Sequence, residues 1–176
     1  MKTPNITTER LLLRGIQETD VQDIYDCWMQ DERVSRYMCW KASSDIEAVK
    51  EFVRFELDQM ESNSWYRFII TLKETEKIIG TCLIFWNEEE NAWDISYNLG
   101  YEYWGNGYIT EAMQAVMDYA TEELNVKECV AAHAIENPAS GRVIQKLGFE
   151  FEKEIVYECN GGDIVTTGKI YRKRLQ

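Results

Sequence analysis

The sequence predicts a mixed α/β domain, built on one mostly antiparallel sheet with a single parallel strand pair and with helices on both faces. Strand-like and helix-like runs alternate along the 176 residues. Three consecutive strand candidates are joined by short charged turns, which is typical of an antiparallel meander. A strand, a glycine loop, a helix and another strand then follow one another, and such a unit pairs its two strands in parallel.

Length and composition favour one ordinary globular domain over residues 1–176. The chain is 45% hydrophobic and 28% charged, and no linker, repeat or low-complexity stretch is visible. The net charge of −12 argues against nucleic acid or an anionic membrane as a partner. It is compatible with a cationic substrate, although an acidic surface also serves solubility.

The cysteines and the N-terminus indicate a cytoplasmic protein with reduced thiols. The five cysteines are scattered, without a C-x-x-C pair, and there is one histidine. We therefore expect neither a metal site nor a disulfide framework. The first residues lack the apolar segment of a signal peptide, and no apolar run is long enough to span a bilayer.

The first third of the chain predicts a strand followed by two helices. Residues 9–14 are an apolar run with charged flanks. Asp20 suits the N-cap of the first helix, whose apolar residues recur at helical spacing up to Met29. The second helix opens with a capping box that runs from Ser44 to Glu47.

The middle of the chain predicts the three meander strands. They cover residues 65–71, 78–86 and 92–99. Charged turns at residues 73–77 and 87–91 separate them.

The last third predicts a helix, a strand, a compact helix and a hairpin. A buried helical stripe runs from Ile109 to Leu124, and residues 128–135 are apolar enough for an interior strand. The compact helix has Asn137 as N-cap and Gly148 just past its end. Two final strands, at residues 149–157 and 168–175, flank a turn at residues 160–162.

The glycine pair at Gly105 and Gly107 is the most informative local motif. It stands between an aromatic, strand-like run and a long amphipathic helix. Glycines there let the backbone approach a ligand and turn N–H groups outward, while the helix dipole points at the same place. The motif predicts a phosphate or pyrophosphate site made from main chain. It lacks the lysine of a P-loop and the third glycine of a dinucleotide fingerprint, but a G-x-G alone also occurs in ordinary turns.

The order of elements and three motifs resemble the GNAT superfamily of N-acetyltransferases. Within it, the RimJ/RimL-like branch of ribosomal-protein-alanine acetyltransferases is the most similar. Residues 8–14 look like the opening strand of that branch, and residues 103–112 look like its pyrophosphate loop and helix start. Residues 136–140, followed by 146–149, look like its second cofactor motif. The resemblance covers almost the whole chain.

The resemblance implies acetyl-CoA as the acetyl donor. Backbone N–H groups of the loop would hold the pyrophosphate; they belong to Trp104, Gly105, Asn106, Gly107, Tyr108, Ile109 and Thr110. Since the strand before the loop splays from the next strand in this family, backbone groups near Leu99, Gly100 and Tyr101 would pair with the pantetheine amides.

The second motif implies the rest of the cofactor site. Asn137 and Ser140 would lie beside the pantetheine arm and the thioester. Lys146 and Arg142 are candidates for the adenosine phosphate, although surface cations at a helix end need no ligand. Glu102 departs from the family, which commonly has Gln or Arg there, and it weakens the local attraction for phosphate.

Two residues are implied as catalytic. Asp94 matches the position where many family members carry a glutamate base, and its shorter side chain favours a water relay; otherwise it is an outward-facing strand residue. Ser140 matches a serine whose hydroxyl can bond the departing sulfur in this branch; otherwise it is a second capping hydroxyl. Many family members have a leaving-group tyrosine where this chain has Ile144.

Several other residues carry weaker hypotheses. Tyr157 and Glu158 fall where the branch can present a second acid or base, although a solvated turn residue explains Glu158 equally well. We expect His133 to be a core or cleft-wall residue, and we assign Glu111 to the helix dipole alone. A further hypothesis is an aromatic cage for an amine, formed by Trp28, Tyr37 and Trp40.

The sequence therefore predicts direct acetyl transfer to a primary amine within a ternary complex. The acceptor is either a protein N-terminal α-amine or a small-molecule amine, and the protein is a monomer or a homodimer. The alternatives are a CoA-binding sensor or scaffold without turnover and an ordinary nucleotide-binding module.

Overall fold

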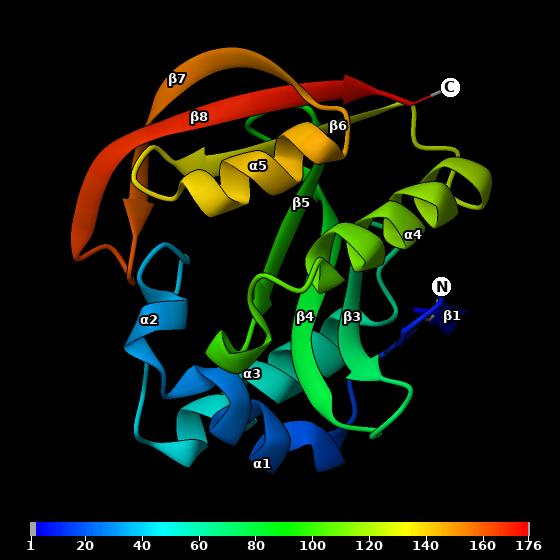
Figure 1. Ribbon diagram of the computed structural model, residues 1–176, viewed down its shortest axis with the longest axis vertical. Coiled ribbons are helices and arrows are strands. Elements are labelled where there is room, and N and C mark those ends of the chain that lie inside the picture. Colours follow the sequence, from blue (N-terminus) through cyan, green and yellow to red (C-terminus); the bar gives the residue numbers. More distant parts are fainter. Residues whose placement is uncertain (1–2, 176) are drawn as a thin grey trace.

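The computed structural model describes residues 3–175 and contains one eight-stranded sheet with helices on both faces (Figure 1). The strand order is β1-β2-β3-β4-β5-β6-β8-β7, and every neighbouring pair is antiparallel except β5 with β6. This confirms the predicted fold class. The strands are Ile6–Thr7 (β1), Leu11–Arg14 (β2), Trp65–Leu72 (β3), Ile78–Asn87 (β4), Ala92–Leu99 (β5), Glu128–Ala134 (β6), Glu150–Cys159 (β7) and Ile164–Arg174 (β8).

Helices cover both faces of the sheet. Successive residues of a strand point to opposite faces, so each face has its own apolar side chains to bury. Phe68 and Ile70 of β3 pack in the core beneath α4 and α5, whereas Ile69 packs in the core beneath α1 and α3. No helix among residues 3–175 is long and apolar enough to cross a membrane. The helical segments are Glu18–Asp20 (η1), Val21–Ile24 (α1), Tyr25–Met29 (η2, a π-helical turn), Glu32–Ser35 (α2), Ile46–Gln59 (α3), Tyr101–Tyr103 (η3), Tyr108–Glu122 (α4) and Pro138–Lys146 (α5).

The first two helices start differently from the prediction. Asp20 is the third residue of η1, and its carboxylate accepts hydrogen bonds from Arg14 (2.8 Å for each oxygen) and from the backbone N–H of Gln17 (2.8 Å). It makes no side-chain cap for α1, because the arginine and the preceding turn occupy it. The cap of α3 lies one residue later than predicted: Asp45, not Ser44, accepts from the N–H of Glu47.

The later elements agree with the predicted order. Asn137 caps α5 by accepting from the N–H of Ser140, and Gly148 follows the helix with φ of 82°. The sequence did not predict β1 or α2, which have two and four residues. It also left open which hairpin strand joins the sheet, and the structure places β8, not β7, beside β6.

The parallel pair separates after a short contact. β5 and β6 pair only from Trp93 to Ile95, which lie opposite Cys129 to Ala131. Beyond this point β5 stays paired with β4 as far as Leu99, and β6 stays paired with β8. The sheet therefore opens between β5 and β6, while β4 and β8 hold these two strands on their outer sides.

A buried ion pair fixes α3 to β3. Glu56 is 1% exposed, and its carboxylate accepts from the guanidinium of Arg67 and from the indole N–H of Trp65, both at 2.7 Å. We expect Glu56→Ala to lower the free energy of unfolding by about 3–5 kcal/mol, because it leaves the half-buried arginine unpaired. Glu51→Ala removes an exposed carboxylate from the same helix, and it should change the free energy of unfolding by less than about 0.5 kcal/mol. Urea unfolding measures both; equal effects would contradict this role.

Candidate functional site

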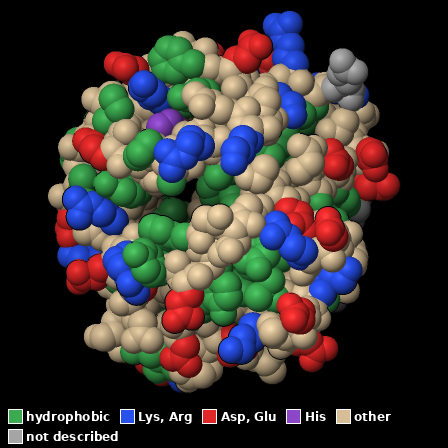
Figure 2. All heavy atoms as spheres, viewed as in Figure 1, with side chains coloured by type: hydrophobic (Ala, Val, Ile, Leu, Met, Phe, Trp, Pro, Cys, Tyr) green, Lys and Arg blue, Asp and Glu red, His purple; other side chains and the backbone are tan. Residues whose placement is uncertain are grey.

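A cleft of about 540 Å³ occupies the gap between β5 and β6. Its wall includes Asp94 and Tyr97, which lie three positions apart on β5 and therefore point to opposite faces of the sheet. Figure 2 shows the hollow opening on one face of the molecule, bordered by hydrophobic and basic side chains. The cleft thus has residues from both sheet faces in its wall.

The glycine loop offers unpaired backbone donors to one end of this cleft. Gly105 and Gly107 adopt φ of 77° and 78°, the left-handed region that glycine tolerates best. Within residues 3–175, no backbone N–H from Gly105 to Thr110 has a protein acceptor, and α4 has no side-chain cap. These N–H groups and the positive end of the helix dipole form an anion site. The N–H of Trp104, also predicted as a pyrophosphate donor, instead donates to the Tyr101 carbonyl (3.2 Å), because it closes the η3 turn.

The opening strand holds this loop in place. Glu111 accepts from the hydroxyl of Thr8 (2.6 Å), the backbone N–H of Arg10 (2.9 Å) and the Arg10 guanidinium (2.7 Å). Arg10 also donates to the carbonyl of Asn106 (3.0 Å) and stacks 4.5 Å over the Tyr108 ring. Glu111 therefore does more than complement the helix dipole: it ties the residue 8–14 motif to the glycine loop.

Strand alternation identifies the backbone groups that face the gap. The N–H of Gly100 donates to Ile79 on β4 (2.9 Å), so even-numbered residues of β5 bond to β4 and odd-numbered ones point toward β6. Past Ile95 the β6 partner is missing, which leaves Tyr97 and Leu99 facing the cleft. The Leu99 carbonyl accepts from the Trp104 indole (3.0 Å).

Two predicted cofactor residues, Gly100 and Tyr101, lie elsewhere. They line a neighbouring hollow together with the other residues of η3, the turn that follows β5 at Gly100. A Cβ on Gly100 would approach the Cys27 sulfur to 2.5 Å, so close packing explains this glycine. Asn106 is absent from the cleft wall, and its side chain donates to the carbonyls of Tyr103 and Trp104.

Ser140 lies on the α4–α5 side of the cleft beside an unexpected partner. Its hydroxyl is 2.9 Å from the hydroxyl of Tyr97, which also donates to the Ser140 carbonyl (3.3 Å). Burial raises the pKa of Tyr97 above its ordinary value, so the phenol stays protonated and can donate. No local motif marks Tyr97; only its position on β5 opposite α5 reveals it. Ile144, at the family's tyrosine position, is 1% exposed in the core.

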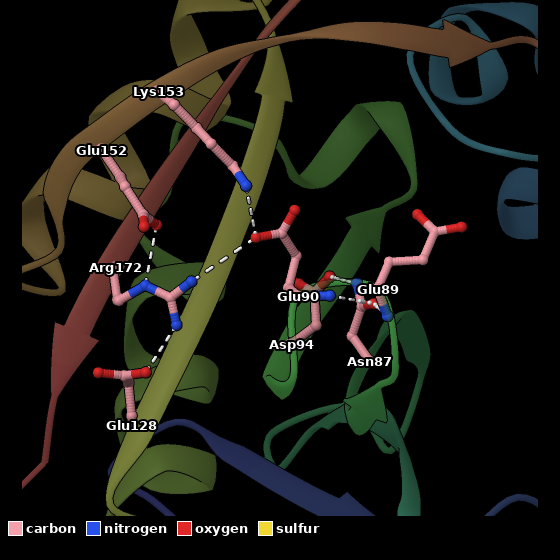
Figure 3. A network of polar contacts seen from close by, with 8 residues as sticks. All are labelled: Asn87, Glu89, Glu90, Asp94, Glu128, Glu152, Lys153 and Arg172. Carbon is pink, nitrogen blue, oxygen red and sulfur yellow. Dashed lines mark hydrogen bonds and ion pairs between the residues drawn. The ribbon is translucent and has the colours of Figure 1, made fainter.

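Asp94 lies on the opposite face and accepts a hydrogen bond from the Asn87 amide (2.9 Å). The Asn87 amide oxygen also accepts from the N–H groups of Glu89 and Glu90, so one side chain connects the β4–β5 turn to the carboxylate (Figure 3). Burial raises the pKa of Asp94 to about 6, and the Asn87 hydrogen bond opposes this increase.

An ion-pair network attaches the same turn to the C-terminal hairpin. Glu90 contacts Lys153 (2.9 Å) and Arg172 (3.6 Å), and Arg172 also contacts Glu128 (2.6 Å) and Glu152 (2.8 Å) (Figure 3). The network connects the β4–β5 turn with β6, β7 and β8 at the closed end of the gap.

Most of the other candidate residues from the sequence line the same cleft. Arg142 and Lys146 line the cleft and are exposed. His133 is a buried cleft-wall residue whose ring bonds the Ala134 carbonyl (2.7 Å). Tyr157 lines the cleft, whereas Glu158 is exposed and absent from its wall.

The predicted aromatic cage does not form. Trp28 is 1% exposed in the core beneath α1 and α3, and Trp40 packs against the same core. Of the three, Tyr37 alone is in the described cleft wall. Residues 3–175 contain no cluster of three or more potential metal ligands, and each of the five cysteines, all within this range, is unpaired.

Comparisons with known proteins agree with this geometry. Residues 10–150 match the family model described as an acetyltransferase (GNAT) domain. An uncharacterized N-acetyltransferase, p20 from Bacillus licheniformis, is 32% identical over 82% of this chain and 82% of its own.

Solved structures share the fold. A GNAT-family acetyltransferase from Bacillus anthracis superimposes with a TM-score of 0.83 at 23% identity, over 97% of this chain and 98% of its own. RimL, a ribosomal L7/L12 α-N-protein acetyltransferase solved with coenzyme A, superimposes with a TM-score of 0.86 at 17% identity, over 98% of each chain.

The raised pKa of Asp94 has a testable effect on stability. Its ordinary pKa is 3.8, so between pH 3.8 and about 6 the folded protein keeps a proton that the unfolded chain releases. The contribution of Asp94 to stability is therefore full below pH 3.8 and lost as the pH rises through about 6. Asp94→Asn should remove this pH-dependent part of the free energy of unfolding, which urea unfolding at a series of pH values measures.

Asn87→Ala should raise the Asp94 pKa further, because it removes a donor to the charged form. Carboxyl carbon NMR measures the titration. Gln114→Ala, which removes an exposed amide donor from Asp118 on α4, should leave Asp94 unchanged. A midpoint near pH 4 in the unmodified protein would contradict the burial argument.

Proposed function

Because this chain belongs to the GNAT family of acetyltransferases, we propose that it transfers the acetyl group of acetyl-CoA directly to a primary amine within a ternary complex. The observation that carries this proposal is the gap between β5 and β6, whose wall contains a carboxylate from one sheet face and a hydroxyl pair from the other. An amine can therefore enter from one side while the leaving thiol departs on the other.

The cleft fits acetyl-CoA through backbone groups. The unpaired N–H groups from Gly105 to Thr110 suit a pyrophosphate. The strand edge at Tyr97 and Leu99, where the Leu99 carbonyl already accepts from the Trp104 indole, suits the amides of an extended arm. Asn137 and Ser140 also line the cleft. When bound, acetyl-CoA supplies the activated thioester; the protein supplies position and proton transfer.

We assign the general base to Asp94. Forming the C–N bond requires the amine to lose a proton, and an ammonium with a pKa above 9 is largely protonated at pH 7. A carboxylate with a pKa near 6 is ionised at that pH and is a better base than an ordinary aspartate. Its short side chain favours a water between it and the amine.

We assign the leaving-group donor to Ser140, positioned by Tyr97. As the C–S bond breaks, the departing sulfur gains negative charge and needs a hydrogen-bond donor. The Tyr97 phenol has one proton; when it points at the Ser140 hydroxyl oxygen (2.9 Å) and not at the Ser140 carbonyl (3.3 Å), the serine hydroxyl proton is free to point into the cleft. This pair takes the place of the tyrosine that many family members carry at the position of Ile144.

The acceptor is a protein N-terminal amine or a small-molecule amine. RimL is named for a ribosomal substrate, which supports the first class for this chain by analogy alone. The unpaired thiols support a reducing compartment, and we propose the cytoplasm. Whether the protein is a monomer or a homodimer stays a prediction.

Release of free CoA thiol from acetyl-CoA tests the proposal. Across a panel of peptides and small amines, at least one acceptor should accelerate release, and the rate should rise with pH through about 6. Asp94→Asn should lower kcat about 10²-fold and abolish that rise. Stabilisation by acetyl-CoA without thiol release would instead indicate a CoA sensor, and an unchanged pH profile would remove Asp94 from the mechanism.

Ser140→Ala should lower kcat about 10–100-fold and leave the KM for acetyl-CoA nearly unchanged, because the hydrogen bond forms as the thiolate departs. Tyr97→Phe should lower kcat less, and it should have no further effect in the Ser140→Ala background if it acts through the serine. Thermal unfolding controls for stability. Additive effects of the two substitutions would contradict this coupling.

A further inference from the structure

The half of the cleft that contains Asp94 has largely uncharged side chains in its wall. We call it the acceptor half; its wall includes the polar Ser96 and Asn98, which share the Asp94 face of β5, together with Val34, Tyr37, Met38, Cys39, Phe85 and Tyr157. Val34 is 5% exposed, and Phe85 lies directly opposite Asp94 in the β4–β5 register. The reacting amine would therefore sit among uncharged side chains with one carboxylate beside it.

Contacts with the C-terminal hairpin hold this wall. The carbonyl of Met38 accepts from the N–H of Asn160 (2.7 Å), and the Asn160 side chain accepts from the Ser35 hydroxyl (3.4 Å). Lys41 forms an ion pair with Asp163, and the Tyr157 hydroxyl donates to the Tyr37 carbonyl (3.5 Å). In Figure 1 the chain that follows α2 meets the end of the β7–β8 hairpin. The acceptor half is thus enclosed by residues far apart in the sequence.

The acidic charge of the protein lies outside this half. Among the residues 3–175 that line the whole cleft, Asp94 is the one carboxylate, whereas Arg33, Arg142 and Lys146 are basic. Arg33 is paired with Asp31 and covers the Tyr101 ring at 3.8 Å. Five carboxylates line the neighbouring hollow beyond η3 instead, namely Asp23, Asp26, Asp31, Glu76 and Glu102. The net charge of −12 is therefore no guide to the acceptor.

From this arrangement we infer that the acceptor is a monoamine carried on an apolar or aromatic body, and not a polyamine. The inference rests on the proposed function, since it treats the Asp94 side as the place where the amine reacts. An apolar body is removed from water against Met38, Phe85 and Tyr157. A second ammonium on the same body would lose its water among uncharged side chains, with no carboxylate to pair with.

Pentylamine and 1,5-diaminopentane test the inference, because they differ by one terminal ammonium. In the thiol-release assay we expect kcat/KM for pentylamine to exceed that for the diamine by at least about tenfold. Two aromatic amines, 2-phenylethylamine and a peptide with N-terminal phenylalanine, separate the small-molecule source from the peptide source. A diamine that equals or surpasses pentylamine would overturn the inference.

Substitutions place the selectivity in the acceptor half. Met38→Glu and Cys39→Glu should each reduce the pentylamine preference by about tenfold, because each supplies a carboxylate for the second ammonium. Cys39 is exposed, so the second variant carries little risk of misfolding. Val156→Glu adds the same charge at a 74% exposed position outside the described cleft wall and should leave the preference unchanged. Equal changes in all three variants would contradict the assignment.

Calorimetry separates the inference from the proposed function. The protein saturated with CoA should bind pentylamine more tightly than 1,5-diaminopentane, whether or not turnover occurs. Preferential binding without thiol release would reject the acetyl-transfer proposal and retain the acceptor class. Thiol release with a preference for the diamine would retain the acetyl-transfer proposal and reject the acceptor class.

Discussion

The early end of the β5–β6 pairing is the constraint on which the site depends. Three residue pairs hold these strands together, and beyond Ile95 each strand pairs with a neighbouring strand on its outer side only. Buried backbone groups are normally paired, so an open stretch in the middle of a sheet favours a ligand that pairs with them. Because the opening lies inside the sheet, side chains of both faces meet in it. Asp94, Tyr97 and Ser140 are close to one cleft for this reason alone.

Polar contacts hold the two sides of the opening in fixed positions. At the closed end, Glu90 connects the β4–β5 turn to Lys153 and Arg172 of the hairpin. At the glycine end, Glu111 and Arg10 fix the loop to the opening strand. The β4–β5 turn is therefore held by the hairpin, and the glycine loop is held by the opening strand. Fixed positions of these segments favour a preorganised cleft.

The sequence predicted most of the fold but less of the site, for physical reasons. Strand runs, the Asn137 cap and the glycine turn are local features, so their sequence patterns predicted them correctly. The ion pair of Asp20 with Arg14 spans only six residues, but it depends on how β2 and η1 are oriented, and the helical pattern does not contain that orientation. The position of β8 depends on residues far apart in the sequence, which local patterns do not contain. The same holds for Tyr97, whose partner Ser140 is 43 residues away. Gly100 differs, because the short η3 turn that follows it directly is a local feature that the sequence pattern did not reveal.

The placement of β8 between β6 and β7 has a consequence for how the chain folds. β6 pairs with β5 over three residues but with β8 over seven, so its main partner is a strand that is synthesised after all the other strands of this sheet. The loop, α4 and α5 precede β8 in the chain, whereas the contacts of residues 35–41 with residues 160–163 join segments about 120 residues apart. Contacts of such separation form late, because loop closure must precede them. During synthesis on the ribosome, the cofactor loop and its helix can assemble first, and the acceptor pocket is completed only after residues 160–163 and β8 have emerged.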